Sequence, residues 1–407
     1  MRKLIILLMA VPLYAFAQPG TLTLQQAIDE ALKNNAGVKA SQFEIESSQA
    51  FKRTGTDIGK TIILGTFGQY NSYAKDNNFT ISQTIPFTAL GSQASLNRSL
   101  EASSILKKAV TENELSYQVK QVFYQLAFTK ARRRLLLQQD SIYEGFLKAA
   151  SARFKAGEGK LLEQTTAEAQ RNETRNQLRQ NDANNTILRT QLMTLLNSDG
   201  LPEIADNDLS EIIFKEMPDT ASASSNPSLA YLRQQVEVAR RHKSVEAAKF
   251  APDLIVGYFN QTLIRTPNPE TGVYSTSSNR FSGFQLGVAI PLWFVPHQAR
   301  VRATEFNRQA VQSNYRNYKI GVSGQIQQAI QQYQKSKSSL DYYQTSALPN
   351  AALILKQSQA AFRGGDIGYA EYLLGVRNAI GIKEGYLQTL NEYNQSIIYI
   401  EFLTGIK

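Results

Sequence analysis

The chain of 407 residues repeats itself once, and this duplication constrains its fold more than any other feature of the sequence. Ile85-Pro86-Phe87 reappears as Ile290-Pro291-Leu292, 205 positions later. Two longer segments recur at an offset of 208, namely 152–157 as 360–365, and 191–197 as 399–405. Near-constant offsets over more than a hundred residues indicate two tandem copies of one structural unit.

The duplication predicts four segments. They are a signal peptide at 1–17, a first structural repeat at 18–197, a linker at 198–226 and a second structural repeat at 227–407. The linker is inferred from Pro202, Pro218, Pro227 and the small, polar run 221–225. Each repeat is expected to open with a helix, over 23–55 in the first copy and 227–250 in the second. The first of these helices is expected to bend near Asn34-Asn35.

A pair of strands is expected next in each copy, within 61–90 and 252–293. Phe79, Ile81, Ile85, Phe87 and Ala89 fall on one parity, and polar residues alternate with them. Phe284, Leu286, Val288, Ile290 and Leu292 repeat this pattern. Period two with one apolar face predicts a sheet between two different surroundings. The joining loops are expected at Tyr73–Asn78 and Thr266–Arg280.

Helical periodicity then continues for an unusually long way, over 92–155 and 298–363. A helix of about 60 residues is roughly 90 Å long and needs coiled-coil neighbours to bury its apolar stripe. Each long helix is expected to reverse at a glycine tip, near 156–160 and near 364–368. The returning helices end near Asn197 and Gly405. The predicted fold class is therefore mostly α with a small β part.

The first residues have the form of a secretory signal peptide. Arg2 and Lys3 precede an apolar stretch over 4–11, and Ala15-Phe16-Ala17 supplies small residues at a cleavage site. Cleavage is expected after Ala17. No later segment offers the run of about 20 apolar residues that a membrane helix needs. Because the chain has no cysteine, neither a disulfide nor a lipid-bearing cysteine is expected.

Four strands of this length can cross an outer membrane but cannot close a barrel, because the smallest closed barrels have about eight strands. Lipid tolerates no open sheet edge. The chain must therefore combine its strands with copies of itself, and either two or three copies remain open on this argument. Pro86 and Pro291, each at the end of a strand, fit bends at which the chain passes from barrel to helix.

Enzymatic, metal-binding and nucleic-acid-binding functions find little support in the residues. His242 and His297 are the only histidines, and no catalytic, cofactor-binding or metal-binding set can be assembled. The basic run Arg132–Arg134 is interpreted as a solvated helix face, although such a cluster can also contact nucleic acid. No enzyme activity, cofactor or nucleic-acid partner is expected.

The repeated order of helix, strand pair, long helix, glycine tip and long helix resembles the TolC-like outer membrane factors. The resemblance covers the mature chain from Leu22 to its end. It implies a homotrimer with a twelve-stranded β-barrel in outer-membrane lipid, continued by a periplasmic α-barrel. It also implies two partners, a periplasmic adaptor protein and an inner-membrane pump, here of the RND type.

The family resemblance also implies sites at the hairpin tips. Adaptor contacts are expected at the tips, at Arg153, Phe154, Gly157, Phe362, Gly364 and Gly365. A periplasmic gate of carboxylates is expected at Glu371, with Asp366 and Glu163 as further members. Leu374 stands where a second gate acid is usual. The alternatives are that the acids are ordinary solvated charges and that Phe154 packs inside its hairpin.

The predicted function is an exit duct that passively conducts cargo delivered by the pump. The runs Asp57–Thr61 and Gly68–Ser72 look most like those of the outer-membrane partners of heavy-metal cation pumps. An exit duct for drugs, or for protein secretion by an ATP-driven (type I) exporter, is the alternative with the same architecture. A periplasmic coiled-coil scaffold is an alternative of a different class, but it leaves the amphipathic strands without a purpose.

Overall fold

The computed structural model describes residues 21–71, 73–205, 209–214 and 224–406. The predicted signal peptide, its cleavage after Ala17 and parts of the predicted linker lie outside these residues. Contacts divide the chain into two compact units. The hairpin unit comprises Met1–Asn35, Leu115–Glu216 and Ala329–Ile400, and the sheet unit comprises Ala36–Glu114, Met217–Gln328 and Glu401–Lys407. Each unit draws on both halves of the sequence, and the repeat boundaries themselves stay a prediction.

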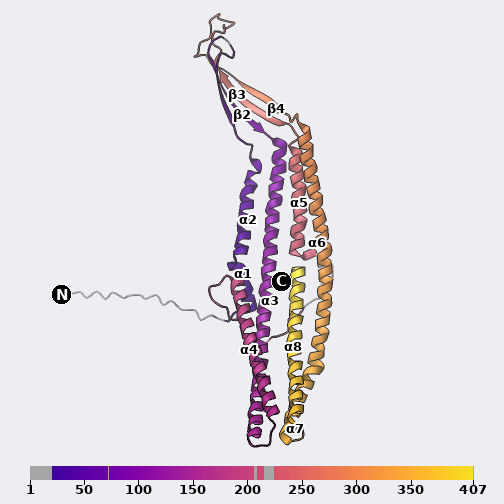
Figure 1. Cartoon of the computed structure of the whole chain (residues 1–407). Helices are drawn as coiled ribbons and strands as arrows, with labels where there is room; N and C mark the ends of the chain where they lie inside the picture. The colour runs from indigo at the N-terminus through magenta and orange to yellow at the C-terminus, as the bar shows by residue number, and fades with distance from the viewer. Residues whose placement is uncertain (1–20, 72, 206–208, 215–223, 407) are drawn as a thin grey trace, which may run out of the picture. The chain divides into compact units, whose positions relative to one another are not determined.

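Two helices replace the single first helix expected from the sequence (Figure 1). α1 spans Leu24–Asn34, α2 spans Ala36–Lys52, and a short 3-10 turn, η1, follows at Arg53–Thr56. The Thr23 hydroxyl caps α1 by accepting from the backbone N–H of Gln26, whose side chain accepts from the Thr23 N–H in return. Asn35 has an extended ψ of 130°, so the predicted bend is a complete break between helices.

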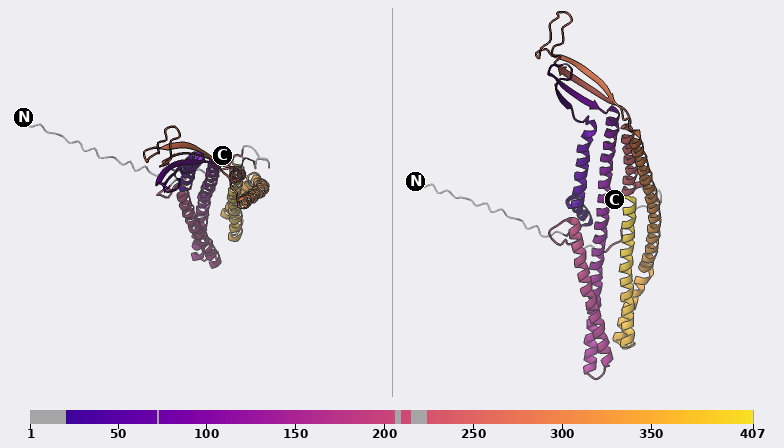
Figure 2. Two further views of the ribbon diagram at one scale, coloured as in Figure 1. Left: turned by 90° about the horizontal axis from the view of Figure 1, so that it is seen from above. Right: turned by 45° about the horizontal axis from the view of Figure 1, so that its top comes forward.

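The sheet unit contains one four-stranded antiparallel sheet in the order β1-β2-β3-β4. Its strands are β1 at Ile62–Gly68, β2 at Asp76–Ile85, β3 at Asp253–Gln261 and β4 at Phe281–Ala289. The central pair joins β2 of the first half to β3 of the second. The loop between β3 and β4 extends beyond the strand ends in Figure 2. The end of the expected Tyr73–Asn78 loop is strand instead, because β2 already begins at Asp76.

The two faces of the sheet differ in chemistry, as the alternation predicts. The register places Ile63 opposite Ile81, Ile81 opposite Tyr258 and Tyr258 opposite Phe284, which makes one apolar row across all four strands. All four side chains of this row are exposed in the single chain. The adjacent row on the other face holds Ile62, Ser82, Gly257 and Gln285. One face is therefore suited to an apolar environment and the other to a more polar one.

Both outgoing long helices begin earlier than their expected starts at residues 92 and 298. α3 begins at Phe87 and α6 at Phe294. The strand alternation expected through Ala89 is wrong beyond Ile85, because Phe87 and Ala89 are helical. Pro86 separates strand from helix, and its carbonyl accepts from the N–H of Leu90 at 3.0 Å. The fixed φ of proline suits this position, where its missing N–H is not needed.

The first hairpin is uninterrupted. α3 runs over Phe87–Lys155 and α4 returns over Leu161–Leu196. The residues of α3 that belong to the hairpin unit bury the apolar side chains of Val119, Leu126, Leu136, Tyr143 and Phe146. In Figure 1, the reversals of both hairpins lie at the same end of the hairpin unit.

The second hairpin contains a joint that the sequence did not predict. α6 at Phe294–Tyr342 is followed by a π-helical turn, η3, at Tyr343–Ala347, and then by α7 at Leu348–Gly364. The chain returns in α8 at Tyr369–Thr404. Pro349 explains the joint, because a proline clashes with the carbonyl four residues earlier and donates no hydrogen bond to it. The wider π turn contains that carbonyl and relieves the clash.

An equivalent hydrogen bond ends the returning helix of each hairpin. Asn35 Nδ2 donates to the carbonyl of Leu195 at 3.2 Å, and Asn226 Nδ2 donates to the carbonyl of Leu403 at 2.9 Å. Asn226 also caps α5 (Pro227–Ala248), since its Oδ1 accepts from the N–H of Leu229 at 2.8 Å. The two acceptors, 195 and 403, are related by the repeat offset of 208. The duplication thus extends to the hydrogen bonds that terminate α4 and α8.

Candidate functional site

The first hairpin reverses through a tight turn after α3. The N–H of Gly157 donates to the carbonyl of Phe154, and the N–H groups of Glu158 and Gly159 both donate to the carbonyl of Arg153, each at 3.0 Å. Gly157 has φ +79°, the left-handed conformation that glycine adopts without strain. Arg153 and Phe154 therefore supply the carbonyls that close the tip, and both side chains are exposed.

The second hairpin reverses by a similar device. The N–H of Gly365, which follows Gly364 at the end of α7, donates to the carbonyl of Phe362 at 3.3 Å, and the N–H of Asp366 donates to that of Ala361 at 2.9 Å. Gly365 has φ +84°. This pattern closes the last turn of α7 in the manner of a Schellman motif. The three glycines expected at the tips all lie at these reversals.

The three expected gate carboxylates occupy the start of the returning helices or the turn before one. Glu163 and Glu371 are each the third residue of their helix, α4 and α8, which confirms that their positions are equivalent. An acid in the first turn is favoured by the positive end of the helix dipole. The Glu371 carboxylate also accepts from the N–H of Gly368 at 3.3 Å. Asp366 is exposed in the turn, and its assignment to a gate stays a prediction, as do those of the two glutamates.

An aromatic cluster that the sequence analysis missed packs the two hairpins together near their tips. Phe146 of α3 lies 5.7 Å from the ring of Tyr369 and 4.5 Å from that of Tyr372, measured between ring centroids. Phe362 of α7 stacks on Tyr372 at 4.7 Å. Tyr143 and Val376 are among the buried residues of the same core. The spacing Tyr369-x-x-Tyr372, which puts two tyrosines on one helical face, was the available signal.

Tyr369 has an unusual environment within this cluster. Its side chain is 8% exposed, and its hydroxyl is buried without a hydrogen-bond partner among the residues that the structure describes. Burial, with smaller contributions from the nearby Glu163 carboxylate and Tyr143, raises the pKa of Tyr369 to about 12. The phenol therefore stays protonated at neutral pH. Tyr369 links α8 electrostatically to Glu163 at the start of α4.

Exposed apolar side chains surround the first tip. Leu161 and Leu162 open α4 with exposed fractions of 58% and 74%, and Phe154 is 42% exposed on the last turn of α3. Leu374, which replaces the second gate acid that the resemblance implies, is exposed on α8 as well. A groove of about 390 Å³ lies between α3 and α7 just behind the tips, with Phe146, Phe362 and Tyr372 in its walls. Exposed apolar residues grouped in this way are typical of a protein contact surface.

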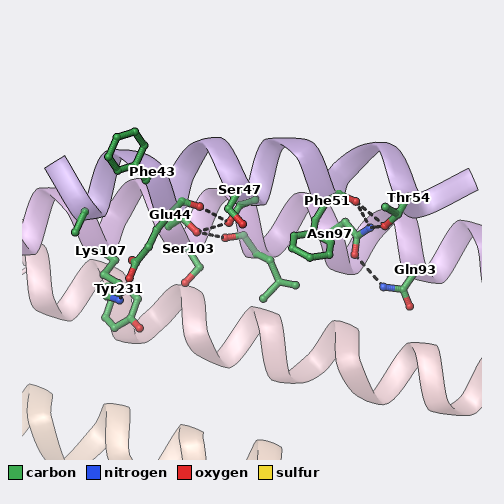
Figure 3. A pocket seen from close by; sticks show the side chains of 14 residues that line it. Phe43, Glu44, Ser47, Phe51, Thr54, Gln93, Asn97, Ser103, Lys107 and Tyr231 are labelled. Carbon is green, nitrogen blue, oxygen red and sulfur yellow. Dashed lines mark hydrogen bonds and ion pairs between the residues drawn. The ribbon is translucent and has the colours of Figure 1, made fainter. Parts of the chain in front are cut away.

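A second, larger groove lies in the sheet unit along α2 and α3 (Figure 3). It has a volume of about 1040 Å³, and Phe43 and Phe51 of α2 project from its rim with exposed fractions of 67% and 64%. Glu44 and Lys107 form an ion pair across it at 2.8 Å, and Tyr231 of α5 closes one side. Small and uncharged polar side chains make up much of its lining, Phe43, Phe51 and Leu100 add apolar surface, and Glu44 and Lys107 are the charged residues that line it.

Several structural findings bear on the classes of function. Within the described ranges, no group of three or more histidine, aspartate or glutamate side chains is placed to hold a metal ion. No described helix is both long and apolar enough to cross a membrane. Arg132 and Arg133 of the basic run form ion pairs with Glu384 at 2.9 Å and Asp182 at 2.8 Å. These two arginines therefore join helices within the hairpin unit.

Comparison with known proteins gives matches over nearly the whole chain, although no known family profile matches. The cobalt-zinc-cadmium resistance protein CzcC of Cupriavidus metallidurans is 22% identical over 407 residues, covering 97% of this chain and 93% of CzcC. Among solved structures, CusC has a TM-score of 0.77 at 16% identity and covers 94% of this chain and 91% of its own. The outer-membrane channel OprN has a TM-score of 0.78 at 14% identity, with coverage of 94% and 89%.

These matches span both hairpins and the sheet, so the whole described architecture is the one seen in outer-membrane channels. The shared fold consists of two long helical hairpins and four strands. The chain thus has the fold of the TolC-like outer-membrane channels, which confirms the resemblance found in the sequence.

Proposed function

We propose that this chain forms the outer-membrane exit duct of a tripartite efflux system, and that cargo passes through it passively. The observation that carries the proposal is the open sheet with an exposed apolar face. Within the described residues, β1 and β4 are each paired on one side only. Unpaired backbone groups in lipid cost several kcal/mol each, so such a sheet requires neighbours if it enters a membrane.

A homotrimer satisfies this requirement. β1 of one copy is antiparallel to β4 of a copy placed beside it, and a head-to-tail contact of this kind closes into a ring. Three copies of the sheet give twelve strands, which leaves room for a pore. The larger groove lies along α2, and the chain leads from α2 through η1 into β1. At the other edge of the sheet, β4 is followed by α6, on which Phe306 and Ile320 are exposed. In such a ring, α6 of the neighbouring copy fills this groove.

The hairpin tips are the proposed contact with the periplasmic adaptor. Phe154, Leu161 and Leu162 present exposed apolar surface there, and Arg153 adds a charge. Glu163, Asp366 and Glu371 form the proposed gate, where three symmetry-related copies of each acid repel one another and attract cations. Tyr369 and the aromatic cluster hold the two hairpins together beside these acids.

The proposed cargo is a heavy-metal cation delivered by an RND-type inner-membrane pump. CzcC, a cobalt-zinc-cadmium resistance protein, supports this cargo, since it aligns over almost the full length of both chains. Secretion behind a signal peptide cleaved after Ala17, with the strands in outer-membrane lipid and the helices in the periplasm, completes the proposal. Pro86 and Pro291 then lie at the bends between barrel and helices.

Two experiments test the duct and its cargo separately. The purified protein, reconstituted in a planar lipid bilayer, is expected to give discrete ion conductance, and its absence in a correctly assembled trimer would exclude a duct. A deletion strain, with and without the gene restored, is then exposed to cobalt, zinc, cadmium, copper and silver salts and to a panel of drugs. Sensitivity confined to metals supports cation efflux. Sensitivity to drugs alone favours the multidrug alternative.

A further inference from the structure

The linker between the two sequence repeats contacts both hairpins. Its first part lies on the first hairpin, where Arg189 of α4 donates from Nε to the carbonyl of Pro202 at 2.9 Å and from Nη2 to that of Leu201 at 3.2 Å. Lys130 of α3 donates to the carbonyl of Ile204 at 2.9 Å. Ile204 also pairs with Leu22 as an isolated parallel bridge. Three hydrogen bonds from cationic side chains to linker carbonyls therefore hold this part of the linker on the first hairpin.

The second part of the linker, residues 209–214, which we name the strap, lies on the second hairpin. Asn394 of α8 is 0% exposed, and its amide binds the strap at two points. Its Oδ1 accepts from the N–H of Ile212 at 2.9 Å, and its Nδ2 donates to the carbonyl of Ser210 at 2.8 Å. A buried side chain thus satisfies both a donor and an acceptor of the strap backbone, and loss of such a bond leaves buried groups unsatisfied.

The strap also touches the π turn of the second hairpin. Gln344, inside the π turn, donates to the carboxylate of Glu211 in the strap. The ring of Phe214 lies 5.6 Å from that of Tyr333 on α6, nearly three turns before the joint. The hydroxyl of Tyr393, beside Asn394, donates to the carbonyl of Ile212 at 3.5 Å. The strap is therefore bound on the outgoing helix, at the joint and on the returning helix.

The joint itself is packed against α8 at a matching site. A Cβ added to Gly385 would overlap the hydroxyl of Tyr343, the first residue of the π turn. Glycine therefore provides the space that the Tyr343 side chain occupies. π turns are rare and occur mostly as single turns within α-helices. The contact between Tyr343 and Gly385 therefore helps to fix where this turn lies.

We propose that the strap is a clamp that fixes the second hairpin at its π turn and, through the rest of the linker, tethers it to the first hairpin. Movement of the second hairpin about the joint then requires release of the strap from Asn394 and Gln344. The clamp acts on the position of a hairpin and is independent of the proposed duct function. The strap then has a mechanical role in addition to connecting the two repeats.

Hydrogen exchange of backbone amides in the full-length protein in detergent tests the clamp. Asn394→Ala is expected to accelerate exchange at Ile212 and throughout Tyr343–Leu348 by about tenfold or more, which corresponds to the loss of roughly one buried hydrogen bond. Asn391→Ala is the matched control. It lies one turn earlier in α8 and is also buried, but its Oδ1 has no partner among the described residues. It is expected to leave both regions within about twofold of the parent protein.

Faster exchange at Ile212 with unchanged exchange at the π turn would overturn the clamp, because the strap would then be a passive loop. An equal effect of Asn391→Ala would overturn it too, since the change would reflect general loosening of α8. Gln344→Ala, at an exposed residue that should not disturb folding, provides a second test and is expected to accelerate exchange in the strap by about two- to fivefold. None of these readouts depends on conductance, so a failed duct and a failed clamp give different results.

Discussion

The two hairpins occupy equivalent positions in the duplicated sequence, but only the second has a joint. α3 continues through 69 residues without interruption, whereas the corresponding stretch of the second half is divided into α6, a π turn and α7. The linker also contacts the two hairpins through different kinds of side chain. It lies on the first hairpin through cationic side chains and on the second through a buried amide beside the joint.

The difference can be followed residue by residue at the offset of 208. Tyr343 of the π turn corresponds to Leu135 in α3, and Gly385, which accommodates it, corresponds to Gln177 in α4. Asn394 corresponds to Thr186, an exposed residue whose hydroxyl bonds within its own helix. None of these three residues of the first half could make the contact that its counterpart makes at the joint or with the strap. The outgoing helix of the first hairpin is therefore uninterrupted, and that of the second is divided at a defined position.

The largest effect is expected from filling the space beside the joint. Gly385→Ala should destabilise the second hairpin by about 1–3 kcal/mol, because the new methyl group displaces the Tyr343 ring. Gly381→Ala, one turn earlier and with nothing within 4 Å of the added methyl, should stabilise by about 0.5–1 kcal/mol through helix propensity. Thermal melting of the two variants measures the difference. Equal shifts would mean that Tyr343 does not hold the joint.

A smaller difference in the free energy of unfolding is expected between alanine variants of Asn35 and Asn226, the asparagines that end the returning helices. Asn226 is 2% exposed and makes both a helix cap and a bond to α8, so Asn226→Ala should cost about 1–3 kcal/mol. Asn35→Ala removes a more accessible amide and should cost about 0.5–1 kcal/mol. Chemical denaturation compares them. A larger loss for Asn35→Ala would show that the first half depends more on its terminating bond than the second.

Most of the architecture was predictable because local chemistry determines it. The order of the elements, the proline at each strand end, the glycine reversals and the position of the bend near Asn34-Asn35 follow from backbone preferences that need no knowledge of tertiary contacts. The starts of the long helices were placed too late because Phe87 and Ala89 continue the alternation of β2 by coincidence. Apolar period alone does not distinguish the end of a strand from the first turn of a helix.

The joint, the strap and the aromatic cluster were not predictable from local patterns. Apolar spacing continues through the π turn, so Pro349 was the only sign of an interruption. Asn394 looks like any polar residue on a long helix, and its burial depends on a linker far away in the sequence. Phe362 was assigned to an adaptor contact, yet its stacking on Tyr372 depends on how α7 and α8 face each other. The gate assignments depend on neighbouring copies and stay predictions.

The aromatic cluster between the hairpins should give a pH-dependent stability. Tyr369 has a pKa of about 12 when folded against 10.0 ordinarily, so the folded state retains its proton when the unfolded state has lost it. Its contribution is complete below pH 10 and is lost as pH rises toward 12, by on the order of 1–2 kcal/mol. Tyr369→Phe should flatten this part of the curve of melting temperature against pH. An unchanged slope would show that Tyr369 does not cause the dependence of stability on pH.

The smallest effect is expected at the ion pair that joins the two hairpins farther from their tips. Arg132 of α3 and Glu384 of α8 are 2.9 Å apart, with side chains 32% and 44% exposed, so solvent screens much of their attraction. A double-mutant cycle with Arg132→Met and Glu384→Gln should give a coupling of about 0.3–1 kcal/mol that falls as salt increases. The pair Arg133–Asp182, which lies within the first hairpin, is the matched comparison. If only the pair between hairpins loses its coupling in Asn394→Ala, the clamp sets the distance between a rigid hairpin and a jointed one. Equal coupling in both backgrounds would place the two hairpins in fixed contact whether or not the strap is bound.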